Sequence, residues 1–200
     1  LKYQVKGNIA LVKKNDPLIS SEIKKNKFKS KIIKVDIKKT NKFIKDIGNN
    51  YFLMETSKEN LSFILEISKK LYLKKDILKK TISKFNGLKY RQQIIYKKKN
   101  LIIINDSKST SFSSTVSLLR AYQNIFWLLG GIPKKGDKFN LSKKYYDNIK
   151  AFIYGNNKSF FIKKLKNKII YKNFSNLKSA LRKSFEMIKD QKKNKNSYFI

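Results

Sequence analysis

The 200-residue chain contains no cysteine and no histidine. The lack of cysteine excludes disulfides, zinc–thiolate sites and thiol nucleophiles. Because imidazole is absent as well, any acid–base or phosphate chemistry must use Lys, Arg, Asp, Glu, Tyr or hydroxyl side chains. Proline is rare, since only Pro17 and Pro133 interrupt the chain. No apolar run approaches the roughly 20 residues needed to span a membrane, so we expect no membrane partner.

Arginine is scarce although the chain is strongly basic. Lysine and arginine together number 48 against 13 acidic residues, which gives a net charge of +35, yet only Arg91, Arg120 and Arg182 are arginine. The charge indicates either a nucleic-acid-binding surface or a compositional bias that places lysine on every solvated face. A surface shaped for phosphate or guanine would use the bidentate guanidinium more often. We therefore favour the bias and expect no nucleic-acid partner.

The apolar content is sufficient for a core. Hydrophobic residues make up 40 % of the chain and aromatics 13 %, which excludes a disordered tail despite the charge. The length suits one large domain or two small ones. The chain starts at Leu1 rather than Met and stops at Ile200 within an apolar segment. We expect both ends to be cuts through a longer protein, so the lack of a signal peptide carries little weight.

Short β-branched runs alternate with amphipathic stretches along the chain. The runs predict strands at residues 9–12, 31–36, 51–54, 93–97, 101–104, 125–129, 151–154, 168–171 and 197–200. The amphipathic stretches predict helices at residues 59–71, 75–85, 112–122, 143–150, 159–165 and 176–190. Ser57 with Asn60 is expected to cap the first of these helices, and Ser111 or Ser113 the third.

The order of these elements predicts an α/β fold. From Leu101 onward strands and helices alternate, which is typical of a doubly wound, mostly parallel, Rossmann-like sheet. The first ninety residues are less regular, with strands followed by two consecutive helices. We therefore predict a boundary near the segment Gly87-Leu88-Lys89-Tyr90-Arg91, with one domain at 1–88 and a second, truncated at its end, at 89–200.

Ligands of such sheets bind beyond the carboxyl ends of the strands, where three predicted loops fall. The loop 105–111 brings Asp106, Lys108 and Thr110 to a helix start, which suits an anion. The same residue types also cap ordinary helices, so both interpretations stay open. The loop 130–137 has a glycine pair and Lys134 but no phosphate-loop or dinucleotide-binding spacing. The loop 155–158 is a plain turn.

Three segments in order resemble motifs of the Mur ligase family. The loop Asn105-Asp106-Ser107-Lys108-Ser109-Thr110 resembles the Asn-Asp-Ser-Lys-Ala-Thr loop of the family's D-glutamate-adding member. The segment Phe85-Asn86-Gly87-Leu88-Lys89-Tyr90-Arg91 is similar to a Phe-x-Gly-Leu-Pro-His-Arg junction, and Gly130-Gly131-Ile132-Pro133-Lys134 to a Gly-Gly-x-x-Lys turn. Asn60 matches the last residue of a His-Asn-x-x-Asn helix entry. The resemblance covers the whole chain, as the late middle domain and most of the C-terminal domain.

The resemblance implies a cytoplasmic, monomeric enzyme of peptidoglycan precursor synthesis, and hence of cell-wall growth and division. Its reaction would use ATP and Mg²⁺ to join D-glutamate to UDP-N-acetylmuramoyl-L-alanine through an acyl phosphate. Lys108 would lie near the acyl phosphate, and Thr110 and Lys134 would bind D-glutamate. A further set would face ATP: Asn60, Arg91 and Asp106. The phosphate loop and metal ligands would lie outside the chain, so we expect no metal site within it and no activity from it alone.

Several residues depart from the family pattern. Tyr90 replaces a histidine beside Arg91, and Thr56-Ser57 replaces His-Asn. Ile132 takes the place of an acid often found after the glycine pair. Two alternatives therefore stay open. One is a related Mur-type ligase with a different amino-acid acceptor, and the other is a basic nucleic-acid-binding α/β protein.

Overall fold

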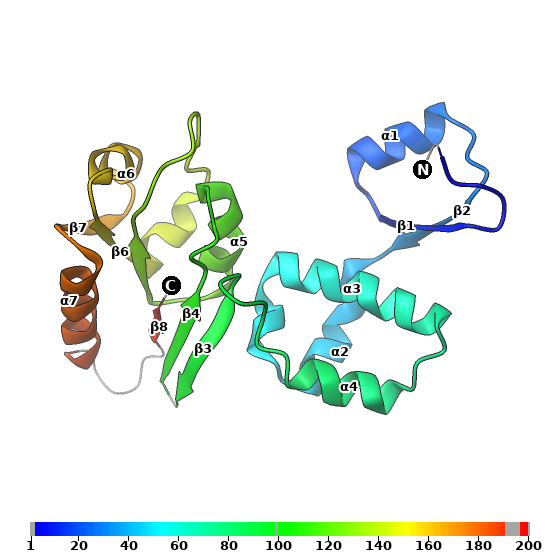
Figure 1. Cartoon of the computed structure of the whole chain (residues 1–200), viewed down its shortest axis with the longest axis horizontal. Helices are drawn as coiled ribbons and strands as arrows, with labels where there is room; N and C mark the ends of the chain where they lie inside the picture. The colour runs from blue at the N-terminus through cyan, green and yellow to red at the C-terminus, as the bar shows by residue number, and fades with distance from the viewer. Residues whose placement is uncertain (1–2, 99, 191–196, 200) are drawn as a thin grey trace. The chain divides into compact units, whose positions relative to one another are not determined.

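The computed structural model describes residues 3–98, 100–190 and 197–199. It divides into two compact units, Leu1–Phe85 and Asn86–Ile200, each considered by itself (Figure 1). The division falls just before the segment at which a boundary was predicted. The identities of the two units as a middle and a C-terminal domain stay predictions.

The first unit combines a small parallel sheet with helices. Its elements are β1 (Ile9–Lys13), α1 (Pro17–Lys25), β2 (Lys31–Val35), η1 (Ile37–Lys39), α2 (Thr40–Ile47), η2 (Asn50–Leu53), α3 (Glu55–Lys70) and α4 (Lys75–Ser83). Strands β1 and β2 pair in parallel, from Ile9 opposite Lys31 to Lys13 opposite Val35. A buried apolar cluster joins α2, η2, α3 and α4 through Ile44, Phe52, Leu61 and Ile82.

The prediction of a strand at residues 51–54 was wrong. This stretch is the 3₁₀ turn η2, because the Asn49 carboxamide accepts a hydrogen bond from the Tyr51 amide at 2.9 Å and nucleates a turn. The same carboxamide donates to the carbonyl of Ile82 at 2.8 Å, and so ties η2 to the end of α4. The aromatic residues that suggested a strand instead fill the core, where Phe52 is 3 % exposed.

Two further expectations in the first unit need correction, and two of its helices were not predicted. Helix α3 begins at Glu55 rather than at residue 59, and Met54, not Ser57 with Asn60, is its N-cap residue. Ser57 is buried inside the helix. The helices α1 and α2 were not predicted, although α1 has a recognisable start, since Asp16 caps it and Pro17 occupies its first turn.

The second unit contains a mostly parallel sheet. Its elements are β3 (Gln93–Lys98), β4 (Leu101–Asn105), α5 (Phe112–Ala121), β5 (Ile125–Leu129), η3 (Lys143–Asn148), β6 (Ile149–Tyr154), α6 (Lys158–Leu165), β7 (Ile170–Phe174), α7 (Leu177–Lys189) and β8 (Ser197–Phe199). Within the described ranges the strand order is β3-β4-β8-β5-β6-β7. All neighbours pair in parallel except β3, which runs antiparallel to β4.

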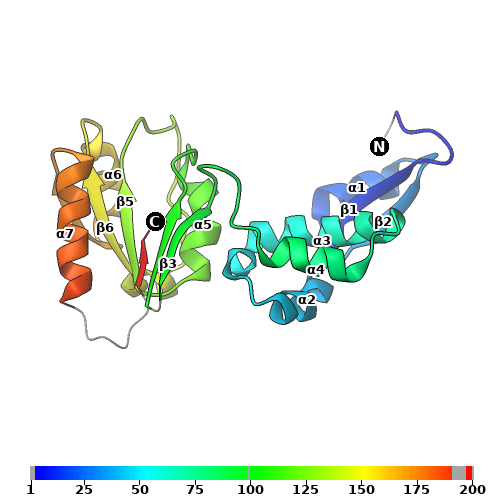
Figure 2. The ribbon, with the colours of Figure 1, turned by 60° about the horizontal axis from the view of Figure 1, so that its bottom comes forward.

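Helices cover both faces of this sheet, as alternation along β5 shows. Phe126 packs with Phe152 and Ala180 of α7 on one face. The neighbouring Trp127 contacts Phe112 of α5 on the other face. Figure 2 shows the strands between these helices. Because helices on both faces of a parallel sheet define a doubly wound fold, the predicted α/β class with a Rossmann-like second part is confirmed.

Some boundaries in the second unit differ from those predicted. The helix expected at residues 143–150 is the 3₁₀ segment η3, which ends at Asn148 because Ile149 already pairs with Ile125 in the sheet. Strand β7 starts at Ile170, two residues after its predicted start. The predicted last strand reached Ile200, which lies outside the described residues.

Of the helices in the described ranges, none combines the length and apolar character needed to cross a membrane.

Candidate ligand site at the carboxyl ends of the strands

Arg91 lies on a tight turn with an unusual backbone. Its amide donates to the carbonyl of Leu88 at 2.9 Å. The residues on either side, Tyr90 and Gln92, have φ angles of +65° and +48°. Residues other than glycine rarely adopt this left-handed conformation, and it persists only where surrounding contacts enforce it. The turn that carries Arg91 is therefore held in place by its neighbours.

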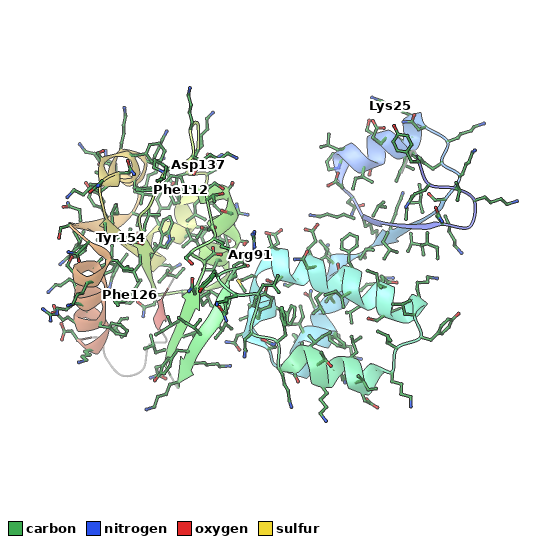
Figure 3. The ribbon with its side chains drawn as sticks, in the orientation of Figure 1. Lys25, Arg91, Phe112, Phe126, Asp137 and Tyr154 are labelled. Atoms are coloured by element: carbon green, nitrogen blue, oxygen red, sulfur yellow. The ribbon has the colours of Figure 1, made fainter. Side chains whose placement is uncertain are left out.

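Two hydrogen bonds from the loop after β4 hold this turn. The Gln92 amide donates to Oδ1 of Asp106 at 3.1 Å, and the Lys108 amide donates to the carbonyl of Tyr90 at 3.1 Å. The ammonium of Lys108 also lies 6.0 Å from the centre of the Tyr90 ring. The structure thus brings Arg91, Asp106 and Lys108 together at the end of one strand (Figure 3 labels Arg91).

The carboxyl of Asp106 is largely buried. Burial raises its pKa above the ordinary value, and the nearby Ser109 hydroxyl, the Gln92 amide and the charge of Arg91 offset only part of that effect. Oδ2 is enclosed by protein and has no hydrogen-bond partner among the described residues. An orphaned acceptor of this kind is costly in its charged form, which is why burial favours the neutral carboxyl.

Helix α5 starts directly after this loop and is strongly capped. The Ser111 hydroxyl and Ser114 form a reciprocal capping box, which confirms Ser111 as one of the two predicted caps. The Ser109 hydroxyl donates to that of Ser114 at 2.7 Å and lies 3.0 Å from Oγ1 of Thr115. The hydroxyls of this loop are therefore engaged in shaping the helix start. Thr110 is exposed between them.

The loop after β5 approaches the same helix start. The Phe112 amide donates to Oδ2 of Asp137 at 2.7 Å; Figure 3 labels both residues. The Asp137 amide in turn donates to the carbonyl of Lys134 at 3.1 Å. Lys134 itself is exposed. The structure therefore joins the loop that carries Lys134 to the helix preceded by Thr110.

The glycine pair of this loop has separate structural roles. A Cβ at Gly130 would lie 2.6 Å from the ring of Tyr154 at the end of β6, so only glycine allows this approach. Gly131 has a φ of +105°, which glycine adopts freely. Its carbonyl accepts a hydrogen bond from the Asn157 carboxamide at 3.1 Å. The loop 155–158, predicted as a plain turn, thus supports the loop after β5.

A small cavity of about 50 Å³ opens where the two loops meet. Thr110, Gly130, Ile132 and Asp137 contribute to its lining, together with the aromatic floor of Phe112, Trp127 and Phe161. Its size suits one or two water molecules or a small ligand group. Of the two residues predicted to bind D-glutamate, Thr110 lines the cavity. The other, Lys134, belongs to a loop that borders it.

Asn60 lies in the first unit and is exposed on α3. Because α3 begins at Glu55, Asn60 lies in the second turn of the helix rather than at its entry.

The first unit has a larger cavity of about 360 Å³ of its own, between the β2–α2 region and the helices α3 and α4. Among the described residues, no group of three or more Asp and Glu side chains could hold a metal ion.

Sequence reasoning did not assign a role to Asp137 or Gln92. A signal for Asp137 existed, since Gly136-Asp137 follows Lys134 in a turn and an acidic residue favours a helix start. Its partner helix begins 25 residues earlier in the chain, and only the tertiary structure identifies it. Nothing local marks Gln92, because its contribution is a backbone amide directed at Asp106.

The chain is similar to known ligases over about two thirds of its length. The chain is 32 % identical over 133 residues to a UDP-N-acetylmuramoylalanine–D-glutamate ligase of a Wolbachia endosymbiont of Brugia malayi, covering 66 % of the chain and 27 % of the relative. It is 36 % identical over 123 residues to the ligase of that name from Rickettsia felis, covering 61 % of the chain and 27 % of the relative. The predicted resemblance to the Mur ligase family is confirmed.

The Mur ligase resemblance has clear bounds. The chain spans about a quarter of the length of the ligases it matches. No protein-family profile matches it. Among solved structures, UDP-N-acetylmuramate–alanine ligase from Thermotoga maritima superposes with a TM-score of 0.48 at 15 % identity, over 73 % of this chain and 34 % of that one.

Proposed function

We propose that the chain is part of an ATP-dependent ligase that joins D-glutamate to UDP-N-acetylmuramoyl-L-alanine in cytoplasmic peptidoglycan precursor synthesis. The observation that supports this most is the pair of hydrogen bonds between the Arg91 turn and the loop after β4. These bonds gather a guanidinium, a buried carboxylate and an ammonium group at the edge of the sheet where ligands of such folds bind. The reaction is proposed from the names of the relatives described above. Two cationic groups beside a carboxylate are suited to a reaction that transfers phosphate.

The Arg91 and Asp106 side chains fit the two ends of ATP. A guanidinium binds phosphate oxygens in a bidentate manner, so Arg91 would take the phosphate end. The carboxylate of Asp106 can only accept hydrogen bonds when it is ionised. Phosphate oxygens only accept hydrogen bonds, whereas the ribose hydroxyls and the adenine amino group donate. Asp106 would therefore bind the nucleoside end. Mg²⁺ bound with the ATP would neutralise phosphate charge.

Lys108, Thr110 and Lys134 would act on the acceptor side. Transfer of a phosphoryl group to the alanine carboxylate gives an acyl phosphate, which the amine of D-glutamate then attacks with loss of phosphate. Negative charge grows on the phosphoryl and carbonyl oxygens, so the exposed ammonium of Lys108 would stabilise it there. Thr110 offers a hydroxyl at the cavity. Lys134 would pair with a carboxylate of D-glutamate.

The test is phosphate release from ATP by the protein at its natural length. Release is expected only when both UDP-N-acetylmuramoyl-L-alanine and D-glutamate are present. Lys108→Ala and Lys134→Ala should each lower the rate by at least about a hundredfold, the usual cost of losing a group that stabilises developing charge. Lys135→Ala removes the same charge from the same exposed turn and should leave the rate unchanged. Full activity of both test variants would refute the assigned site.

A related ligase with a different acceptor is the alternative that one observation favours. Ile132 lines the cavity and is 89 % exposed, at a position where the resemblance would place an acid. An apolar residue there could select a different side chain on the incoming amino acid. A screen of D- and L-amino acids in the same assay distinguishes the two. A higher kcat/KM for another amino acid than for D-glutamate would decide for the alternative.

A further inference from the structure

The carboxylate of Asp137 links the two loops of the candidate site. Its Oδ2 accepts a hydrogen bond of 2.7 Å from the amide of Phe112, the first residue of α5. The two residues lie 25 positions apart, and one belongs to the loop after β5 and the other to the helix after β4. The contact is partly buried, which strengthens a hydrogen bond to a charged group.

The position of this bond explains why it holds the loops firmly. The first amides of a helix have no partner within the helix, and the Ser111 cap serves the amide of Ser114 rather than that of Phe112. A carboxylate is also favoured at the positive end of the helix dipole. Beyond the bond, the Phe112 ring is 3 % exposed and packs against Phe139, two residues after Asp137. Both sides of the link are therefore anchored in the core.

The link sets the separation of the two groups assigned to D-glutamate. Thr110 precedes Phe112 by two residues, and Lys134 precedes Asp137 by three within a turn closed by the Asp137 amide and the Lys134 carbonyl. Both Thr110 and Lys134 have exposed side chains, so the position of each depends on the backbone of its loop. The hydrogen bond from the Phe112 backbone amide to the Asp137 side chain thus connects the two loops, across the cavity that Thr110 and Asp137 both line.

We infer that Asp137 is a positioning residue for the binding of the amino-acid substrate. It acts through the Phe112 amide, fixes the Lys134 turn against the Thr110 helix start, and touches neither ATP nor the reacting atoms. The inference rests on the proposed function, since it takes D-glutamate as the substrate held between the two loops.

The test compares three variants of the protein at its natural length by steady-state kinetics. Asp137→Ala removes the acceptor and is expected to raise the KM for D-glutamate about tenfold, the effect of losing one hydrogen bond to a charged group. The KM for ATP is expected to change less than twofold. Asp137→Asn keeps a carbonyl oxygen that can accept from Phe112 and should restore most of the affinity. Asp147→Ala, which removes an exposed carboxylate from η3, should match the unchanged protein.

The outcomes separate the inference from the proposed function. If the unchanged protein does not use D-glutamate, the proposed function fails, and the inference fails with it because it takes D-glutamate as the substrate. If the unchanged protein uses D-glutamate but Asp137→Ala leaves its KM unaltered, the inference is overturned. Equal increases in the KM for ATP and for D-glutamate, or no rescue by Asp137→Asn, would also overturn it, because a purely structural loss affects both substrates alike.

Discussion

Single residues at this site are held in conformations that cost free energy. Tyr90 and Gln92 both adopt left-handed backbone angles around Arg91, and each such residue costs of the order of 1–3 kcal/mol. Asp106 offsets part of that cost through its hydrogen bond to the Gln92 amide, but loses solvation itself. A strained turn joined to a buried carboxylate is typical of a functional site, where geometry is favoured over stability.

Burial of Asp106 predicts a pH dependence of stability. Its folded pKa is raised above the unfolded value of about 3.9, so the folded state favours the neutral carboxyl. Its contribution is fully present below the unfolded pKa and is lost as pH rises through the folded pKa. Asp106→Asn cannot ionise. The free energy of unfolding of Asp106→Asn minus that of the unchanged protein should therefore increase as the pH is raised from about 3 to about 7.

Urea unfolding at a series of pH values measures this difference. Asp147→Asn serves as the matched control, because Asp147 is an exposed carboxylate in the same unit. Subtracting the pH series of this control from that of Asp106→Asn leaves the part of the difference that is specific to position 106. A difference for Asp106→Asn that is independent of pH, or that shrinks as pH rises, would contradict a raised pKa.

The elements of the second unit meet closely where β5 and β6 end. Leu129 pairs with Ile153, so Gly130 and Tyr154 follow side by side. The Tyr154 ring occupies the space that a side chain at position 130 would need, and it packs on the cluster of Phe126, Phe152 and Ala180 (Figure 3). Burial also raises the pKa of the Tyr154 hydroxyl. The glycine therefore lets the ring close the edge of the sheet beside the candidate site.

Gly130→Ala should lower the free energy of unfolding by about 1–3 kcal/mol, the usual cost of overpacking. The added Cβ would lie 2.6 Å from the Tyr154 ring, which must then move. In a Tyr154→Ala background the same substitution should cost much less, because the obstructing ring is gone. A double-mutant cycle by urea unfolding measures this coupling. Equal costs in the two backgrounds would show that the ring is not the obstacle.

Elements with a strong periodic pattern were predictable, and those created by distant contacts were not. Strand β5 and the start of α5 match their predicted positions, since a short continuous apolar run and the Ser111 cap are both local signals. Asn49 converts an aromatic run into η2 through bonds to α4, more than 30 residues away. Pairing of Ile149 with Ile125 likewise ends η3 before its predicted limit. These outcomes depend on partners that a local pattern does not contain.

The charge of the whole molecule predicts a response to salt. A net charge of +35 on 200 residues opposes compaction by self-repulsion. Raising NaCl from about 10 mM to about 150 mM shortens the screening length from about 30 Å to about 8 Å. The Tm should rise by several degrees over this range, as differential scanning calorimetry can measure. Sucrose at equal osmolality is the control, and an equal rise with sucrose would point away from electrostatics.

The same charge provides a check on the remaining alternative of nucleic-acid binding. Attraction by dispersed lysines should be detectable by fluorescence anisotropy at low salt and vanish near physiological salt, because released counterions drive it. Binding to single- or double-stranded nucleic acid that persists well above that concentration would favour the alternative.

The sequence by itself determined the fold class, the order of most strands and helices, and the residue types available for chemistry, because hydrophobic periodicity and helix capping are local properties. It also identified Arg91, Asp106, Lys108 and Thr110 as candidates by their motifs. Only the tertiary structure decided that the Arg91 turn is hydrogen-bonded to the loop after β4 and that Oδ2 of Asp106 is enclosed by protein. It also decided that Asp137 connects the loop after β5 to the start of α5. The reason is physical: a parallel sheet brings strand ends together across long sequence separations, and those contacts leave no local signature.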